Sequence, residues 1–361
     1  MQKKFLNKIK QIEWPLFLAC LGASAAGLWL ISASTGAESE RYLTVQLASL
    51  AIGAAAFLVL SIVPPTRLFP GWKLILLAEI AVIALLIPFG VGMELTGNKS
   101  WIRFEFFGLS TGFQPGELAK VLYILSLSGH AAKLDLPGRW LDLAAFVLHA
   151  ALPPVFLLVV STDFGMIPSF AIIFVVIALA AGVKLKCFIS TVVALGLFSP
   201  FIWSDLLLER QRERLSIMLD PSADALGMGY QTIQSVNAII SGGMHGSDID
   251  RLTNLPARHT DFIFSVAGEK LGFVGCTIIL AMLVGLILRA LWGTAFCGSF
   301  QGSLTCAGVA GMLIFQVFAN IGMCLGISPV IGITLPFFSY GGTSAAVSFV
   351  EAGLVSAYRK T

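Results

Sequence analysis

Ten long apolar segments constrain what this sequence can fold into. Each holds about 20 mostly apolar residues, the length that a helix needs to cross the hydrocarbon core of a bilayer. With 57% hydrophobic and 12% charged residues among 361, the composition excludes an ordinary soluble domain. We therefore predict an all-α polytopic membrane protein of about ten transmembrane helices. The predicted segments are 14–34, 42–63, 73–90, 115–132, 140–160, 165–183, 187–204, 262–288, 303–325 and 338–357.

The distribution of Lys and Arg predicts the orientation of these segments. If the N-terminus is cytoplasmic, every inner connection carries at least one basic residue, as the positive-inside rule expects. Both termini are then cytoplasmic, and the long loop at 204–261, between the seventh and eighth segments, is extracytoplasmic. The first segment follows a basic stretch but is long enough to span, so we predict an uncleaved helix. No internal repeat divides the chain, so residues 1–361 form a single predicted membrane domain.

The long loop and the cysteines each suggest a further expectation. Apolar residues recur near helical spacing in the loop, at Tyr230, Ile233, Val236 and Ile240, which predicts amphipathic helices. The sequence has no basic, aromatic-interleaved patch typical of nucleic-acid binding. Its six cysteines lie in or beside apolar segments without CxxC spacing, so we interpret them as buried small hydrophobic side chains.

A polar stretch at 255–264 joins the long loop to the eighth segment. It contains His259, Thr260 and Asp261. A carboxylate at the end of a membrane helix is costly to desolvate, so its presence indicates a function more often than a surface Asp does. Asp261 is therefore the leading candidate for a functional residue. A zinc site needs at least three protein ligands, so we predict that His259 makes hydrogen bonds or lies at an interface.

Charged residues also occur at two other segment boundaries. Pro115 suits the first turn of a helix, which places Glu117 and Lys120 three residues apart on one face, close enough to pair. A structural intramembrane ion pair is favoured slightly over a direct catalytic role. Asp163 is predicted to cap the next helix, an interpretation favoured over a ligand role.

Two more features bear on the Asp261 region. Glu269 follows Asp261 by eight residues, about 12 Å of helix rise, so the two cannot pair directly on an unbroken helix. Pro329 and Pro336 interrupt the segment 326–344, which then runs into small polar residues that include Ser339. Irregular backbone at such depth survives only where protein or water satisfies it. The segment either lines a cavity with Asp261 or is a loop leading into a tightly packed helix.

Several stretches together resemble the SEDS family of membrane glycosyltransferases, which contains the RodA and FtsW proteins. The ten-helix topology and long outer loop of that family agree with the segments above. Three features favour RodA over FtsW. The stretch 212–221 ends in Leu219-Asp220-Pro221, Arg258 precedes His259, and both cytoplasmic ends of the chain are short. The matching stretches, in the order of the family, are Trp101 with 114–120, 162–165, 212–221, 229–235, 255–264, Glu269 with 271–272, and 336–342.

The resemblance implies a function and a set of site residues. It implies polymerisation of lipid II at the outer face of the bacterial inner membrane, for cell-wall elongation and cell shape, with a class B penicillin-binding protein, membrane lipid and the elongation machinery as partners. Asp261 would be the catalytic residue, acting as general base on the 4-hydroxyl of the acceptor sugar. A divalent cation, Mg or Mn, would neutralise the pyrophosphate through ligands that remain unidentified. Arg212, Arg214 or Lys120 could share that task. The implied substrate-binding or cavity residues are Trp101, Arg103, Glu117, Lys120, Arg212, Arg214, Gln234, Ser235, His259, Thr260, Glu269 and Ser339.

Two other functions remain open from the sequence. A lipid II flippase or transporter could use the same helices, but transporters favour charges near mid-span and often carry an inverted repeat. Here Asp261, Trp101 and Arg103 lie at the outer edge of the membrane, which favours the polymerase. A non-catalytic scaffold for the transpeptidase is the second alternative, because the stretch 246–251 and Lys270 depart from the usual pattern of the family.

Overall fold

A computed structural model describes residues 12–63, 71–93, 98–106, 109–197, 199–201, 204, 209–224, 227–247 and 255–358. Each of the ten predicted segments contains a helix, and the all-α polytopic prediction is confirmed. Among the described residues, six helical spans are long and apolar enough to cross a membrane. The main helices are α2 (Trp14–Thr35), α3 (Ser39–Ile62), α5 (Trp72–Ala84) with α6 (Leu86–Phe89), α8 (Pro115–Ala131), α9 (Trp140–Ser161), α10 (Ile167–Ala180), α11 (Leu185–Leu197), α15 (Ile263–Phe296), α16 (Phe300–Cys324) and α17 (Gly342–Tyr358).

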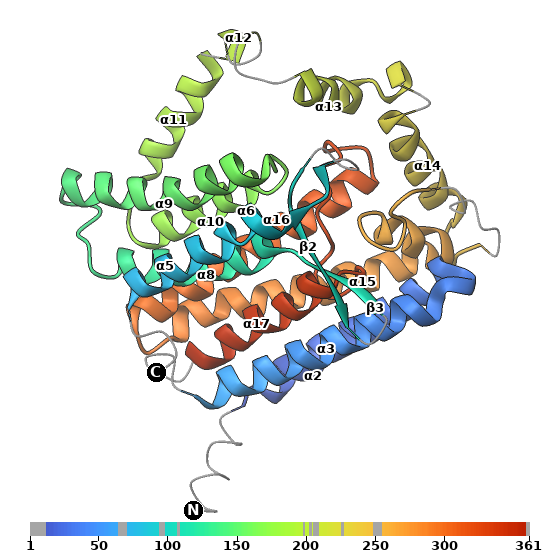
Figure 1. Cartoon of the computed structure of the whole chain (residues 1–361), viewed down its shortest axis with the longest axis horizontal. Helices are drawn as coiled ribbons and strands as arrows, with labels where there is room; N and C mark the ends of the chain where they lie inside the picture. Colours follow the sequence, from blue (N-terminus) through green and yellow to red (C-terminus); the bar gives the residue numbers. More distant parts are fainter. Residues whose placement is uncertain are drawn as a thin grey trace, which may run out of the picture.

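The helix α16 forms the centre of the bundle. Its most apolar stretch is 78% buried, whereas those of the other five long spans are 22% to 44% buried. Figure 1 shows the long helices running side by side, with α2 and α3 along one edge and α9 and α10 along the other. Small residues permit the closest crossings: a Cβ at Gly53 of α3 would lie 2.9 Å from the Cα atom of Ala346 in α17.

A three-stranded antiparallel sheet, which the sequence analysis did not predict, precedes α8. Its strands are β1 (Gly90–Val91), β2 (Trp101–Phe106) and β3 (Leu109–Phe113), in that order, with Ile102 opposite Phe113. At its end, the amide of Gln114 donates to Oγ1 of Thr343 over 3.0 Å. The sheet is thereby held against the first turn of α17.

The long loop contains the predicted helices. They are α13 (Glu209–Leu219) and α14 (Met228–Ser241), with a 3-10 turn at Pro221–Asp224 between them, and the short α12 (Ser199–Phe201) lies before the loop, within the seventh predicted segment. In Figure 1, α11, α12 and α13 form an arch that leaves the bundle and returns through α14. Ile217 and Met218 of α13 approach Thr232 of α14 and the segment 328–330. The loop therefore returns to the bundle beside the segment that follows α16.

The helix α15 is broken at Gly272, where φ is +66°. The residues that follow α14 satisfy the backbone groups at this break. The amide of Phe273 donates to the carbonyl of Gly243 over 2.8 Å, and the amide of Ser247 donates to the carbonyl of Glu269 over 2.8 Å. The end of α14 is thus fixed to the break, where a Cβ on residue 272 would collide with backbone atoms of 244–246.

A chain of buried polar side chains joins α5, α8 and α9. The Nδ1 atoms of His130 and His149 lie 2.9 Å apart, and Nε2 of His149 lies 3.3 Å from the hydroxyl of Ser126. That hydroxyl donates to Glu79 over 3.2 Å. The ring of Trp72 stacks on His130 with a centroid separation of 3.9 Å. The two histidines therefore pack in the interior and also form hydrogen bonds.

The prediction that Asp163 caps the following helix is wrong. The helix α10 begins at Ile167, and its N-cap, Met166, makes no side-chain cap bond. The Asp163 carboxylate instead accepts from the amide of Gly165 over 3.1 Å and from the hydroxyl of Ser100 over 2.8 Å. Since Asp163 lies four residues before the helix, its carboxylate ties the approach to β2 to the turn after α9.

Candidate active site

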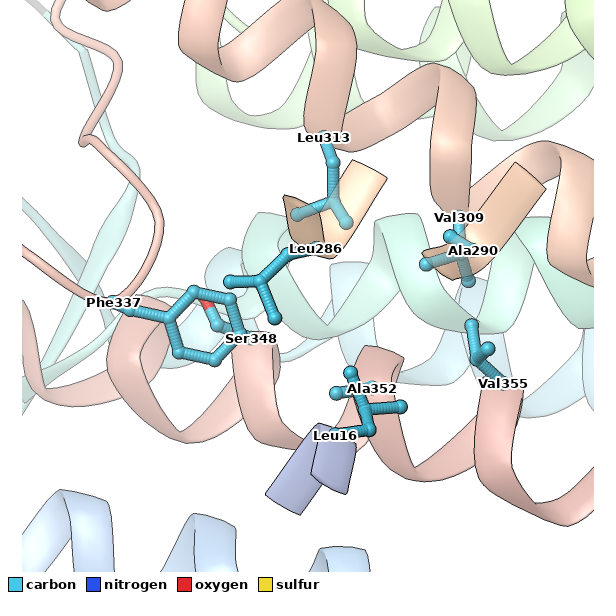
Figure 2. Close-up of a pocket in the computed structure, with 9 residues that line it drawn as sticks. All are labelled: Leu16, Leu286, Ala290, Val309, Leu313, Phe337, Ser348, Ala352 and Val355. Carbon is cyan, nitrogen blue, oxygen red and sulfur yellow. The ribbon is translucent and has the colours of Figure 1, made fainter. Parts of the chain in front are cut away.

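One cavity in the bundle lacks the charged or polar side chains that a reaction would need. Figure 2 shows a space between α2, α15, α16 and α17 that is lined by apolar side chains with Ser348 as the polar exception. It measures about 10 Å³. This volume accommodates no more than about one water molecule, so the space is a packing defect.

Asp261 lies in a compact turn immediately before α15. The amides of Thr260 and Phe262 both donate to the carbonyl of Ala257, over 3.1 and 3.2 Å, and the Thr260 hydroxyl donates to the same carbonyl over 3.1 Å. Phe262 is the N-cap of α15. The predicted start of the eighth segment, at residue 262, is therefore confirmed to within one residue. Asp261 lies half-buried just before this helix.

The segment 326–341 clamps this turn from the other side. The hydroxyl of Ser339 donates to the carbonyl of Thr260 over 2.6 Å, and the amide of Tyr340 donates to the carbonyl of His259 over 2.8 Å. The Nδ2 atom of Asn320 donates to the carbonyls of Asp261 and Ile333, over 2.8 and 2.7 Å. The segment therefore holds the Asp261 turn through hydrogen bonds. A cavity that the segment lines together with Asp261 stays a prediction.

Two amide side chains that the sequence analysis missed complete the clamp. Asn320 lies on α16, and Gln46 of α3 donates to the carbonyl of Ser339 over 3.1 Å while its Oε1 accepts from the amide of Gly341 over 3.1 Å. Both are almost fully buried. Each is a polar residue inside an apolar span, which is the signal that could have singled it out.

Burial sets the charge state of the two titratable side chains in the turn. It raises the pKa of Asp261 to about 6, although the hydrogen bond with Thr260 acts in the opposite direction. Burial and the nearby charge of Arg258 lower the pKa of His259, against the opposing effect of Glu38. Near neutral pH the carboxylate is therefore ionised and the imidazole neutral. A carboxylate with a pKa near 6 suits general-base catalysis.

His259 belongs to an aromatic cluster beside the turn. Its ring centroid lies 4.5 Å from that of Tyr42 and 5.5 Å from that of Tyr340. Tyr42 and Tyr340 meet edge to face at 4.9 Å. His259 thus holds the turn against α3 and the segment before α17.

The predicted Glu117–Lys120 ion pair is confirmed. Nζ of Lys120 lies 2.8 Å from Oε1 of Glu117, and both side chains are almost completely buried. The pair lines a cavity of about 30 Å³ together with Gln114, Gly165, Met166, Ser169 and residues 331–334. Gly332, in that lining, also lies next to Asp261: a Cβ there would be 3.6 Å from Oδ2. The segment 331–334 therefore links the ion pair to the carboxylate.

Two further predicted residues lie on helices next to the turn, Ser235 on α14 and Glu269 on α15. The hydroxyl of Ser235 in α14 donates to the carbonyl of Cys324 over 2.7 Å and hydrogen-bonds the hydroxyl of Ser265. The thiol of Cys324 lies 3.7 Å from the carbonyl of Asp261. Glu269 is buried on the first part of α15, two turns beyond the N-terminus of the helix.

The remaining predicted residues lie further out in the fold. Trp101 and Arg103 are exposed on β2, and the Trp101 ring covers Gly112 of β3. Gln234 is half-buried on α14. Nη2 of Arg212 donates to the carbonyl of Ser204 over 2.9 Å. Arg214 lies on α13, but its side chain is outside the described part of the chain, as are residues 248–254.

An apolar groove opens beside the first turns of α15. Its volume is about 370 Å³, and α14, α15 and α16 form its walls around the break at Gly272. Phe264, which follows Asp261 by three residues in the sequence, is one of the residues that line it. The lining residues are Ile239, Ile240, Gly243, Phe264, Gly272, Phe273, Cys276, Thr277, Leu280, Ile321 and Leu325.

Replacing Asn320 with Leu is expected to loosen the Asp261 turn. Two buried carbonyls lose their donor, and each loss costs about 1–3 kcal/mol. The thermal unfolding temperature should fall, and turnover should fall further because the carboxylate is misplaced. The matched control is Gln316→Leu, which removes another buried amide from α16 one turn earlier. Equal effects of the two variants on turnover would contradict a positioning role for Asn320.

Together, the fold and the site define a multi-pass membrane protein with a half-buried carboxylate held in a clamped turn, between an ion-paired cavity and an apolar groove. The family model for the FtsW, RodA and SpoVE proteins, described as cell cycle proteins, matches residues 16–361. The chain belongs to this family.

Named relatives and solved structures agree with this membership. The chain is 33% identical to peptidoglycan glycosyltransferase MrdB of Escherichia coli K12, covering 94% of this chain and 90% of the relative. It is 30% identical to the probable peptidoglycan glycosyltransferase FtsW of Bacillus subtilis 168, covering 99% and 92%. A structure described as coordinating polymerization and crosslinking in a peptidoglycan synthase complex aligns with a TM-score of 0.83, 31% identity and coverage of 97% and 98%. The crystal structure of Thermus thermophilus rod shape determining protein RodA aligns with a TM-score of 0.70, 26% identity and coverage of 97% of each chain.

Proposed function

We propose that Asp261 catalyses the polymerisation of lipid II into glycan strands. The chain is a peptidoglycan glycosyltransferase of the bacterial inner membrane, and its similarity to MrdB and to a RodA structure favours the RodA branch of its family. The observation that carries the assignment of Asp261 is its position: a half-buried carboxylate in a turn clamped by Asn320 and Ser339. Such a group is oriented for proton abstraction before substrate binds.

In the proposed reaction, Asp261 takes the proton of the acceptor sugar's 4-hydroxyl. The hydroxyl oxygen attacks the anomeric carbon of the donor, and the undecaprenyl pyrophosphate leaves with the electron pair of the broken C–O bond. A positioned base accelerates such a step by roughly 100-fold or more. Lys120, one of the predicted phosphate partners, lines a cavity with the segment 331–334, and Gly332 of that segment lies next to Asp261.

A divalent cation, which the family resemblance implies, would neutralise the leaving pyrophosphate. Within the described ranges, no group of three or more His, Cys, Asp or Glu residues could hold a metal ion. The described residues therefore do not fit a cation held by protein ligands alone. Magnesium commonly takes most of its ligands from substrate phosphates and water, and we propose that arrangement here.

The apolar groove beside Phe264 supports a lipid-linked substrate. Polyprenyl chains bury well against apolar side chains, and the groove starts three residues from Asp261. We place the site on the extracytoplasmic face because the basic residues favour that orientation. The partner we propose is a class B penicillin-binding protein, since the similar synthase complex couples polymerization to crosslinking.

The decisive experiment is reconstitution with the transpeptidase partner, lipid II and a divalent cation. Glycan polymer is the expected product. A lipid II analogue with a shortened prenyl chain should polymerise less efficiently if the groove holds the tail. Movement of lipid II across proteoliposomes without polymer would support the flippase, and stimulation of the transpeptidase without polymer would support the scaffold.

The rate of polymerisation is expected to fall in acid. A general base must be ionised, and burial places the pKa of Asp261 at about 6. Activity should therefore be full above that pH and drop about tenfold per unit below it. The measurement is initial rate against pH at saturating cation. A rate that stays constant well below pH 6, with the protein folded, would contradict the assigned base.

A further inference from the structure

Two thiols meet at the end of α15 opposite Asp261. Cys297 is the C-cap residue of α15, and Cys306 lies in the second turn of α16. Their sulfur atoms are 3.5 Å apart, and both cysteines are free. Only the short link 297–299 separates the two long helices at this point, so the thiols face each other across a tight helical hairpin.

The two cysteines differ in accessibility. Cys297 is half-buried and lies between Phe296 and Gly298, which are both exposed, whereas Cys306 is completely buried. Cys306 packs tightly against Gly293 of α15. A Cβ atom added at residue 293 would lie only 3.0 Å from the Sγ atom of Cys306. A reagent from solution can therefore reach Cys297 first and Cys306 only through it.

The surroundings of Cys297 favour its thiolate. The hydrogen bond with Cys306 lowers the pKa of the Cys297 thiol, burial opposes this, and the positive charge of Arg289 lowers it further. A thiolate that is partly exposed and poised beside a second cysteine is the arrangement found in redox-responsive cysteine pairs. A structural buried cysteine has none of these features.

We propose that Cys297 and Cys306 form a reversible oxidation site that reacts with hydroperoxides. The Cys297 thiolate attacks one peroxide oxygen, the O–O bond breaks, and protonation of the leaving oxygen releases water or an alcohol. Cys297 is then a sulfenic acid. The Cys306 sulfur attacks the Cys297 sulfur, the S–O bond breaks, and water leaves with the proton of the Cys306 thiol. A disulfide is the product, and a thiol reductant restores the pair.

The geometry allows this product. A disulfide needs a sulfur separation of about 2.05 Å, so the two atoms must approach by roughly 1.5 Å. Cys297 can supply that movement because it lies at a helix end with exposed neighbours. The hydroxyl of Ser303 already donates to the carbonyl of Thr294 over 2.7 Å, so the disulfide would add a covalent bond to an existing contact between α15 and α16.

The site can be tested on the purified full-length protein in detergent. The protein is treated with graded hydrogen peroxide, alkylated under denaturing conditions and analysed by peptide mass spectrometry. We expect a reducible 297–306 cross-link, with loss of both thiols, at doses that leave Cys20, Cys276 and Cys324 alkylatable. In C306S the reaction should stop at the sulfenic acid, which a cyclic 1,3-dione traps on Cys297. In C297S the Cys306 thiol should remain alkylatable.

Cys187, an exposed thiol on α11, is the internal comparator. If peroxide oxidises Cys187 while Cys297 and Cys306 both stay alkylatable, the proposal fails. It also fails if the chain, unfolded before oxidation, gives as much of the 297–306 cross-link as the folded protein. Absence of a dione adduct on Cys297 in folded C306S would show that Cys297 is not the attacking sulfur.

Discussion

The variant Asp261→Asn is expected to lose glycan polymerisation by roughly 100-fold or more while remaining folded. An amide cannot take the proton from the acceptor hydroxyl, yet it has nearly the size of the carboxylate. The contacts that hold the turn use the backbone carbonyl of residue 261, which accepts from Asn320. The substitution leaves that carbonyl unchanged, so a loss of rate should not reflect a loss of fold.

Polymer length and yield from lipid II, measured with the transpeptidase partner present, provide the readout. The control is Asp142→Asn, which removes a carboxylate from the first turn of α9 and should leave polymerisation unchanged. Thermal unfolding and co-purification of the partner verify that both variants are intact. If Asp261→Asn polymerises as well as the unaltered protein under these conditions, Asp261 is not the base.

The sequence was most informative where burying a charged side chain in or beside the membrane costs free energy. A carboxylate at 261 and an ion pair at 117 and 120 are expensive in or beside a membrane, and both lie at the site. The amides of Gln46 and Asn320 are also polar residues in apolar spans. However, a lone amide does not reveal which distant carbonyl it binds, and their partners lie 13 to 295 residues away.

Two features of the backbone were missed for different reasons. The stretch Trp101-Ile-Arg-Phe-Glu-Phe alternates with a period of two, which is a strand signal, but the surrounding helical pattern concealed it. The break at Gly272 leaves little trace in sequence, because glycine occurs often in membrane helices. What stabilises the break is tertiary: carbonyls of residues 243 and 244 accept from the amides of Phe273 and Val274.

The second large effect is expected for the Glu117–Lys120 pair. Glu117→Gln leaves Lys120 as a buried cation without its carboxylate partner at 2.8 Å, and breaking such a pair costs about 3–5 kcal/mol. The thermal unfolding temperature and the yield of folded protein should then fall, since domains are stable by only about 5–15 kcal/mol. The measurement is the thermal unfolding temperature in detergent together with the yield of monodisperse protein.

The charge-swapped double variant Glu117→Lys with Lys120→Glu separates structure from chemistry. The swap restores the pair and places a cation in the first turn of α8, which costs only about 0.3–1 kcal/mol through the helix dipole. Because that cost is small beside the loss in the single variant, folding should return. Glu351 of α17 is buried and interacts electrostatically with both residues. Adding Glu351→Gln to the double variant therefore tests whether this third carboxyl group limits the recovery of folding. A double variant that folds and polymerises would make the pair purely structural. A stable double variant without activity would show that one of the two charges, in its original position beside the cavity, has a direct role in the reaction.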